Sequence, residues 1–323
     1  MSQPLRFFRS SIAVAALASI TAFAADFPAK PVRLITPFPP GGSVDLVARL
    51  LGADLAKAWA QQVVVDNRAG ASGNIGTELA KNAAPDGYAL LVNTLPFVTN
   101  QFAYSKVPYD PVADFAPVSL LSSVASVLVS HPALPVNSMK DLVALARARP
   151  GQLNYPSAGV GSSSHLAGEL LAILTGIRIV HIPYKGGGPA MIDTISGEMH
   201  MMFATMPAAM PHVKSERVRP VAVTTARRSQ TLPALPTIAE TGIKGYEAST
   251  WYGVLAPAKT PRAVVERLHG EIVKMLAAPE IRERLGAQGF EPAGNTPEEF
   301  ATYTKSEIAK WGKVIRAAGI KAE

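Results

Sequence analysis

The chain has 323 residues, of which 48% are hydrophobic and 17% are charged, so it is too apolar for a disordered protein and long enough for two domains. It contains no cysteine, which excludes disulfides, cysteine-based zinc sites and a thiol nucleophile. The net charge of +7 is spread along the chain in short clusters without interleaved aromatic residues, a pattern that does not indicate nucleic-acid binding.

Residues 1–24 have the composition of a secretory signal peptide. Arg6 and Arg9 precede an uncharged run over residues 10–25, and Ala22-Phe23-Ala24 provides a small-residue cleavage site. The apolar run is shorter than the ~20 residues that a membrane-spanning helix needs. We therefore expect cleavage after Ala24 and export of the mature protein, with an uncleaved anchor as the alternative.

After this segment, short β-branched apolar runs alternate with amphipathic stretches, the pattern of parallel strands covered by helices. The sequence therefore predicts an α/β protein. We expect strands over residues 32–38, 63–66, 88–93, 127–130, 153–157, 179–183, 199–203 and 218–225. We expect helices over residues 44–60, 138–149, 165–174, 189–196, 261–277, 279–288 and 297–318.

Capping signals mark the ends of several of these helices. The patterns Ser138-x-x-Asp141 and Thr296-x-x-Glu299 are those of capping boxes. Thr260 stands before Pro261 as a predicted N-cap, and Gly319 suits the end of the last helix.

Two segments, 109–121 and 246–256, are apolar and partly extended, which favours stiff crossovers between two lobes over a flexible tether. The chain would then start in one lobe, visit the second and return. We predict that lobe 1 comprises residues 25–124 and 248–323, and that lobe 2 comprises residues 125–247.

The first candidate binding turn, Pro40-Gly41-Gly42-Ser43, follows a predicted strand and opens a helix. The first amides of a helix have no partner within it, and glycine lets a ligand approach them, so such a turn suits an anion. Ser43 is either the N-cap or a hydroxyl donor to the ligand. Asp45 is interpreted as a favourable first-turn acid, and a capped loop without a ligand is the alternative for the whole motif.

The second candidate turn, residues 157–165, again lies between a strand and a helix, and it combines free amides with three consecutive hydroxyls. This composition suits a carboxylate or a phosphate. His165 is either a ligand contact or a packed or capping histidine, because the motif contains no Asp or Glu partner. A third turn follows the next strand with Tyr184 and Lys185, and Asp193 beyond it is either a surface residue or a group that holds water in a cleft.

Signatures of enzymes are poor in this sequence. It lacks Gly-x-Ser-x-Gly, His-Glu-x-x-His and the P-loop pattern, and Gly159-x-Gly161 is not completed into a dinucleotide-binding motif. The six histidines are not spaced as metal ligands, so no metal site is predicted.

Several long motifs together resemble those of Bug-type extracytoplasmic solute receptors, the binding-protein components of tripartite tricarboxylate transporters. The resemblance covers residues 30–323. The motifs are residues 37–45 (PFPPGGSVD), 67–76 (NRAGASGNIG), 84–88 (APDGY), 114–118 (DFAPV), 163–169 (SSHLAGE), 183–186 (PYKG) and 311–314 (WGKV).

This resemblance implies a type II periplasmic binding protein with two doubly wound α/β lobes and a ligand cleft between them. It further implies a periplasmic monomer that holds a small carboxylate through backbone amides and hydroxyls, needs no metal or cofactor, and delivers the ligand to membrane subunits. The residues carried over as ligand-binding are Pro40, Gly41, Gly42, Ser43, Thr94, Ser157, Ala158, Gly159, Gly161, Ser162, Ser163, His165, Tyr184 and Asp193.

Two further expectations concern the ligand and the activity. Many members of the family have an acidic or polar residue where this chain has Ala204, which favours a plain organic acid over an amino acid. We expect no catalytic residues. The alternatives are a ligand sensor for a signalling partner and a secreted hydrolase that uses Ser163 with His165.

Overall fold

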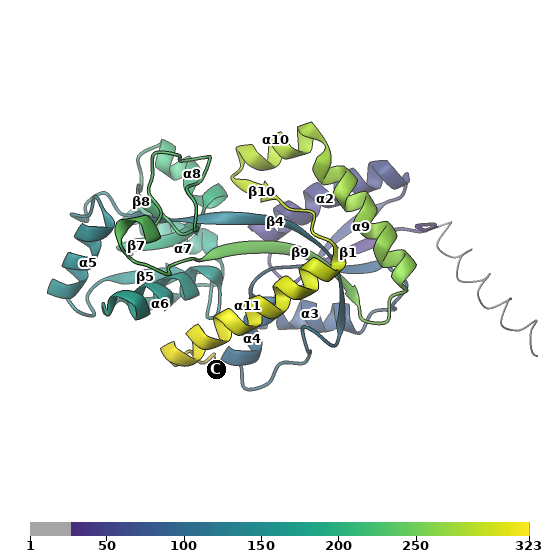
Figure 1. Ribbon diagram of the computed structural model, residues 1–323, viewed down its shortest axis with the longest axis horizontal. Helices are drawn as coiled ribbons and strands as arrows, with labels where there is room; N and C mark the ends of the chain where they lie inside the picture. The colour runs from purple at the N-terminus through teal and green to yellow at the C-terminus, as the bar shows by residue number, and fades with distance from the viewer. Residues whose placement is uncertain (1–26, 323) are drawn as a thin grey trace, which may run out of the picture.

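The computed structural model describes residues 27–322, so the predicted signal peptide lies outside the described range. The chain forms two α/β halves that lie side by side and share one sheet (Figure 1), which confirms the predicted α/β class. Among the described residues, no helix is both long enough and apolar enough to cross a membrane.

The half that contains both ends of the described chain is built on three parallel strands. Strand β1 (Val32–Thr36) lies between β2 (Val63–Asn67) and β3 (Ala89–Asn93). The carboxyl ends of these strands therefore lie at one edge of the sheet, where ligands bind in many α/β proteins. The helices of this half are α2 (Ser43–Trp59), α3 (Asn74–Lys81), α4 (Pro96–Ala103), α9 (Arg262–Ala277), α10 (Pro279–Ala287) and α11 (Pro297–Ala318).

The other half repeats the α/β design on a smaller scale. Strands β5 (Asn154–Ser157) and β6 (Val180–Pro183) form a two-stranded parallel sheet, while β7 (Met201–Thr205) and β8 (Arg219–Val223) join the large sheet. The helices of this half are α5 (Met139–Ala148), α6 (Ser163–Thr175), α7 (Gly187–Ser196), α8 (Met206–Lys214) and the short η2 (Ala239–Thr241).

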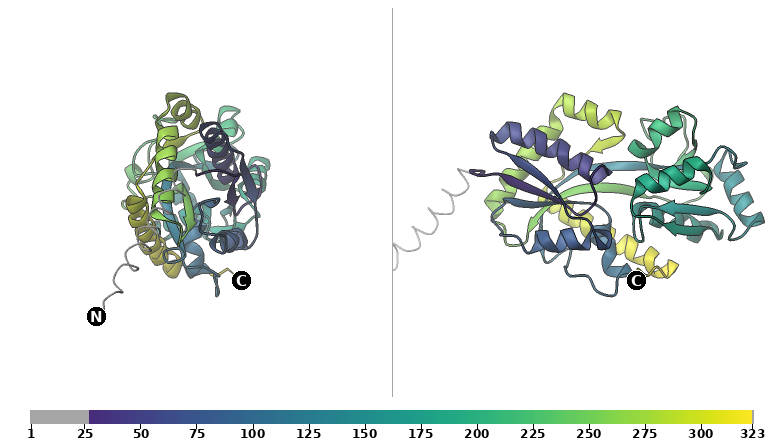
Figure 2. Two further views of the ribbon diagram at one scale, coloured as in Figure 1. Left: turned by 90° about the vertical axis from the view of Figure 1, so that its right-hand side faces the viewer. Right: turned by 180° about the vertical axis from the view of Figure 1, so that it is seen from behind.

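Two long strands connect the halves. Strand β4 (Phe115–Ser130) pairs with β9 (Ser249–Pro257) and β10 (Phe290–Pro292) in its first part and with β7 and β8 in its last part. Both predicted crossover segments thus contribute to neighbouring strands of one sheet (Figure 2). The expected parallel pairing is found for β1 with β2 and β3 and for β5 with β6, whereas β4 and β9 carry the chain in opposite directions and pair antiparallel. The predicted lobe boundaries remain a prediction.

Some elements differ from those predicted. The expected strand over 127–130 is the end of the 16-residue β4. Helices α3, α4 and α8 were not predicted. In α4 six of the eight residues are buried, so no amphipathic period marks it, and α8 contains Pro211.

The capping predictions mostly hold. The Ser138 hydroxyl accepts from the Asp141 amide at 3.2 Å, both bonds of the Thr296–Glu299 capping box are present, and Gly319 has a left-handed φ of 64°. Thr260 was wrongly expected to cap α9. The N-cap is Pro261, and the Thr260 hydroxyl is buried without a hydrogen-bond partner in the described structure.

Helix α11 packs on β4 and α4 and also on α6 of the other half (Figure 1). Glu307 joins it to β9, because its Oε2 accepts from the indole nitrogens of Trp251 at 3.2 Å and Trp311 at 2.9 Å. Burial raises the pKa of Glu307, although both indoles oppose this shift. The native state therefore favours the protonated form of this carboxyl more than the unfolded state does.

Replacing Glu307 by Gln tests this effect. Because the native pKa is raised, the wild-type free energy of unfolding should fall as the pH rises from about 4.5 toward that pKa, by at most about 1.4 kcal/mol per pH unit. E307Q should lack this component, since its amide carries no charge. Urea unfolding followed by tryptophan fluorescence at pH 5 and pH 7 would measure the difference, with E283Q on the exposed part of α10 as the control. An E307Q profile parallel to that of the wild type would contradict the prediction.

Candidate functional site

The predicted binding turns follow strands in both halves of the molecule. The first turn, defined as residues 37–43, follows β1, and Thr94 follows the neighbouring β3. The second turn, residues 157–163, follows β5, and the third turn, residues 184–188, follows the neighbouring β6. Because each pair of strands is parallel, each half brings its predicted residues to one edge of a sheet.

The first turn presents backbone amides at the start of α2. Pro40, Gly41 and Gly42 are exposed, and Gly41 has a positive φ of 82°. The N-cap is Gly42, which has no side chain, so Ser43 is the first helical residue and not the cap. The amides of Gly42, Ser43 and Val44 have no acceptor within the described part of the chain, which leaves them available to a ligand.

Asp45 supports this turn from inside. Its carboxylate is buried and accepts from the Gly41 amide at 3.0 Å, the Arg49 Nε at 2.9 Å and the Asn67 Nδ2 at 3.0 Å. Burial alone would raise the pKa of Asp45, but these hydrogen bonds outweigh it and hold the pKa below its usual value. Asp45 therefore fixes the turn as an ionised carboxylate next to the open amides, and Arg49 compensates part of its charge.

The side chains of the second turn are largely occupied with its own backbone. Four side chains accept hydrogen bonds from backbone amides of the turn. Ser157 Oγ accepts from the Gly159 amide at 3.1 Å, and Ser164 Oγ accepts from the Ala158 amide at 3.0 Å. His165 Nδ1 accepts from the Gly161 amide at 3.1 Å, and Ser162 Oγ accepts from the His165 amide at 3.4 Å. Ser162 is thus the N-cap of α6. The amides of Val160, Ser163 and Ser164 and the Ser163 hydroxyl have no partner among residues 27–322. These are the donors that the second turn can offer to an anion.

His165 is packed below this turn, in line with the second of its two interpretations. It is 5% exposed and its ring stacks on that of His181, with centroids 3.6 Å apart and planes at 8°. The carboxylate that the motif lacked is supplied one turn later by Glu169, whose Oε1 lies 3.7 Å from His165 Nε2 and accepts from the Tyr155 hydroxyl at 2.7 Å.

The sequence reasoning missed His181. Its Nε2 lies 2.6 Å from Ser157 Oγ, so it contacts the second turn directly. Burial, with a smaller contribution from His165, lowers the pKa of His181 to about 3. The signal in the sequence was its place two residues before the end of a predicted strand, parallel to the strand that carries Ser157.

In the third turn the Tyr184 hydroxyl donates to Asp193 Oδ2 at 2.5 Å. This bond raises the pKa of Tyr184 to about 12, because losing the proton would place two negative charges side by side. Two of the predicted site residues therefore form one unit.

Beyond Thr94, the half that contains the first turn carries polar groups to the second turn. Thr94 is 8% exposed, and its hydroxyl has no partner in the described structure. On the following helix α4, the Thr99 hydroxyl donates to the Gly161 carbonyl at 3.1 Å. A Cβ placed on Gly159 would lie 4.0 Å from Ser72 Oγ. The second turn thus lies against the other half of the molecule.

Ser72 and Thr99 were also absent from the predicted site. Ser72 belongs to η1 (Ala71–Gly73), where both Ala71 and Ser72 have positive φ values of 46° and 50°. Such a conformation is costly for residues other than glycine and is often kept at functional sites. The glycine-rich sequence 67–76 was the available signal, but it served only as a motif of the family resemblance and its residues were not assigned to the site.

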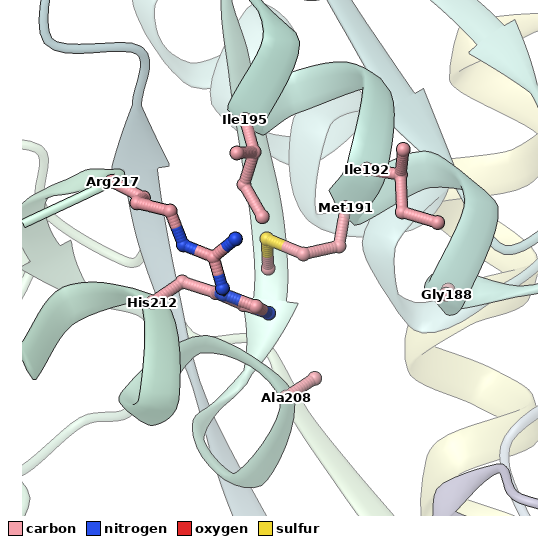
Figure 3. A pocket seen from close by; sticks show the side chains of 8 residues that line it. Gly188, Met191, Ile192, Ile195, Ala208, His212 and Arg217 are labelled. Atoms are coloured by element: carbon pink, nitrogen blue, oxygen red, sulfur yellow. The ribbon is translucent and has the colours of Figure 1, made fainter. Parts of the chain in front are cut away.

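A separate pocket of about 370 Å³ lies between α7 and α8 (Figure 3). Met191 and Ile195 line it together with Arg217 and His212. Asp193 lies two residues from each of the first two along α7 and therefore on the other side of that helix. Gly187 and Gly188 of the third turn also line it, but none of the residues predicted to bind the ligand does.

The geometry does not assemble a hydrolase from Ser163 and His165. No hydrogen bond joins their side chains within residues 27–322, and His165 Nδ1 faces the Gly161 amide. Ser157, which does contact a histidine, is fully buried. No group of three or more metal-ligating side chains is found in the same described range.

Comparison with known proteins places these features in context. Residues 47–320 match the model of the tripartite tricarboxylate transporter family receptor. A protein encoded in the tcbD–tcbE intergenic region of Pseudomonas sp. strain P51 is 43% identical over 290 residues, which cover 90% of this chain and 86% of that protein. BugT of Bordetella pertussis is 38% identical over 297 residues, which cover 91% of each chain.

Solved structures show the same fold. A Rhodopseudomonas palustris protein with adipate superimposes with a TM-score of 0.87 at 38% identity, over 91% of this chain and 99% of that one. The periplasmic binding protein BugD gives 0.84 at 33% identity, over 92% and 100% of the chains. MatC from the same R. palustris, with bound malate, gives 0.82 at 29% identity, over 90% and 100%. These structures confirm the expected periplasmic-binding-protein fold.

The half-buried His181 yields a prediction on acid stability. Its folded pKa of about 3 lies below the ordinary 6.5, so its contribution to stability is present above pH 6.5 and is lost as the pH falls toward 3. H181F should lack this loss, which amounts to up to about 1.4 kcal/mol per pH unit in the wild type. Urea unfolding at pH 7 and pH 5 would measure it, and an unchanged difference between the two pH values in H181F would contradict the assignment.

Proposed function

Because the chain belongs to the tripartite tricarboxylate transporter receptor family, we propose that it is a periplasmic receptor for a small organic acid. The ligand is a di- or tricarboxylate or a related acid. The loaded receptor delivers it to the membrane subunits of a transporter of this family.

The observation that carries this proposal is the pair of helix starts, one in each half. Gly42, Ser43 and Val44 open α2 with amides that have no partner among the described residues, and Ser163 and Ser164 open α6 in the same way. Hydrogen bonds to a charged group contribute ~1.5 to 3 kcal/mol each. Four or five of them, less the costs of ordering and desolvation, support micromolar affinity.

The arrangement also explains why two carboxylates suit the site. A ligand with an acceptor at each end bonds to both helix starts at once, and only a closed arrangement of the halves supplies both sets of donors. The adipate and malate named for two similar structures are both dicarboxylates. Ala204, which is buried in β7, offers no charge to a ligand ammonium, in keeping with a plain organic acid.

Two alternatives make different demands. A secreted hydrolase needs a nucleophile that a base can reach, but within residues 27–322 no hydrogen bond joins the side chains of Ser163 and His165, and His165 Nδ1 accepts from the Gly161 amide instead. A ligand sensor would bind the same acids but act on a signalling partner. Deleting the gene separates the sensor from the receptor, because loss of a receptor stops uptake whereas loss of a sensor stops only induction.

Ligand binding can be tested by thermal shift. We expect the purified mature protein to gain stability with one of four acid classes: aliphatic dicarboxylates such as adipate and malate, citrate-like acids, acidic amino acids and aromatic acids. The gain should be RT ln(1 + [L]/Kd), about 2.7 kcal/mol at a hundredfold excess over Kd. No ester should be turned over. An esterase activity that S163A abolishes would contradict the receptor proposal.

The first turn can be tested with a charged cap. Asp at position 42 is a good N-cap, and Gly42 has an ordinary φ of −80° and a Cβ position that meets only the Pro39 carbonyl oxygen, at 3.8 Å, so G42D should keep the unfolding free energy or raise it by about 0.3 kcal/mol. The same carboxylate should abolish acid binding by repelling the ligand. G42N caps the helix without the charge and serves as the matched control, with weakened but measurable binding by calorimetry. Wild-type affinity in G42D would mean that the first turn is not part of the site.

A further inference from the structure

We propose that His181 is a positioning residue of the carboxylate site, because it fixes Ser157 and His165, the two side chains that hold the Gly159 and Gly161 amides inside the second turn. This inference rests on the proposed function, since it names what keeps one side of that site in a binding arrangement. His181 itself lies on β6 and is not among the predicted ligand contacts.

The first anchor runs through Ser157. His181 Nε2 and Ser157 Oγ are 2.6 Å apart, and the same oxygen accepts from the Gly159 amide at 3.1 Å. Ser157 has no exposed surface, so water cannot replace the imidazole without opening the turn. Removing Nε2 would leave the Ser157 hydroxyl with partners only in its own turn and free its rotamer.

The second anchor runs through His165. Its Nδ1 accepts from the Gly161 amide at 3.1 Å, which requires this nitrogen to be unprotonated and the ring to keep one orientation. The ring plane is set by the stack on His181, at 3.6 Å between centroids. His181 therefore sets the orientation of His165 Nδ1, the acceptor for the Gly161 amide.

The two anchored amides belong to glycines in the left-handed region. Gly159 has a φ of 130° and Gly161 a φ of 76°, conformations in which glycine has many alternatives. With both amides turned inward, the remaining donors of the turn are those of Val160, Ser163 and Ser164. If the anchors fail, the glycines can rotate and these donors no longer converge on one anion.

The charged and titratable neighbours of the stacked pair come from β5, from α6 and from the segment before β9. Glu169 comes from α6, and its Oε1 is 3.7 Å from His165 Nε2. Tyr155 on β5 donates to Glu169, and the buried Tyr246 donates to the Ala167 carbonyl nearby on α6. Glu169 lies beside His165 Nε2, which leaves His165 Nδ1 available to the Gly161 amide. Of the two histidines, only His181 contacts Ser157.

The experiment compares two replacements of His181 in the mature protein at pH 8, with adipate as the probe in calorimetry, or malate if only that acid gives a thermal shift. H181F keeps an aromatic ring to stack on His165 but loses the contact with Ser157. H181Q keeps a polar side chain that can reach Ser157. H200F is the matched control, because His200 contacts Asn154 at the opposite end of β5.

We expect H181F, which loses the contact with Ser157, and H181Q, which loses the stack on His165, each to weaken binding at least tenfold, and H200F to leave it unchanged. Amide hydrogen exchange in the ligand-free proteins should be faster at Gly159 in H181F and faster at Gly161 in H181Q. Wild-type affinity together with native exchange at Gly159 in H181F and at Gly161 in H181Q would overturn the proposal. If no acid binds the wild type, the proposed function fails, while the exchange data still decide whether His181 positions the turn.

Discussion

Helices α2 and α6 each begin with backbone amides that cannot bond within the helix, and the surrounding residues determine which of these amides remain open. In the first turn, Asp45 accepts from Gly41 and leaves the next amides free. In the second turn, Ser157 and His165 take the amides of both glycines and leave those of Ser163 and Ser164. The site is thus defined as much by the donors that are already satisfied as by those that are not.

The shared strands give these two turns a fixed relation to the rest of the molecule. Because β4 and β9 run side by side through the sheet, the halves are joined by two neighbouring extended segments and not by a loose linker. Helix α11 packs on both halves, and Glu307 ties it to β9 through the indole of Trp251. A motion of one half relative to the other must involve these segments, because the chain passes between the halves there.

Much of this architecture could be predicted because its signals are local. Apolar runs followed by Gly and Ser mark the strand-to-helix turns, and Ser138 and Thr296 mark helix starts. The antiparallel pairing of β4 with β9 could not be predicted, because residues such as Val124 and Thr250 meet only in the folded chain. Helix α4 was not predicted because it is buried on nearly all sides and shows no amphipathic period.

The candidate site, too, could be predicted only where its signals are local. Glycine and serine content located both turns, but it could not indicate that Ser157, Ser162 and Ser164 bond inward, because these contacts depend on where His165 and the backbone lie in three dimensions. His181 is 24 residues from Ser157 and meets it only because β5 and β6 are parallel neighbours. Ser163, the residue in the cluster whose hydroxyl has no described partner, could not be distinguished from its neighbours by sequence.

The central claim is that helix starts in both halves hold one carboxylate ligand. The most direct measurement is a titration of the ¹⁵N-labelled mature protein with the acid that gives the largest thermal shift, followed by amide NMR. The account predicts saturable shifts at Ser43 and Val44 together with Ser163 and Ser164, with one dissociation constant. Shifts confined to one of these helices, or centred on the pocket between α7 and α8, would contradict it.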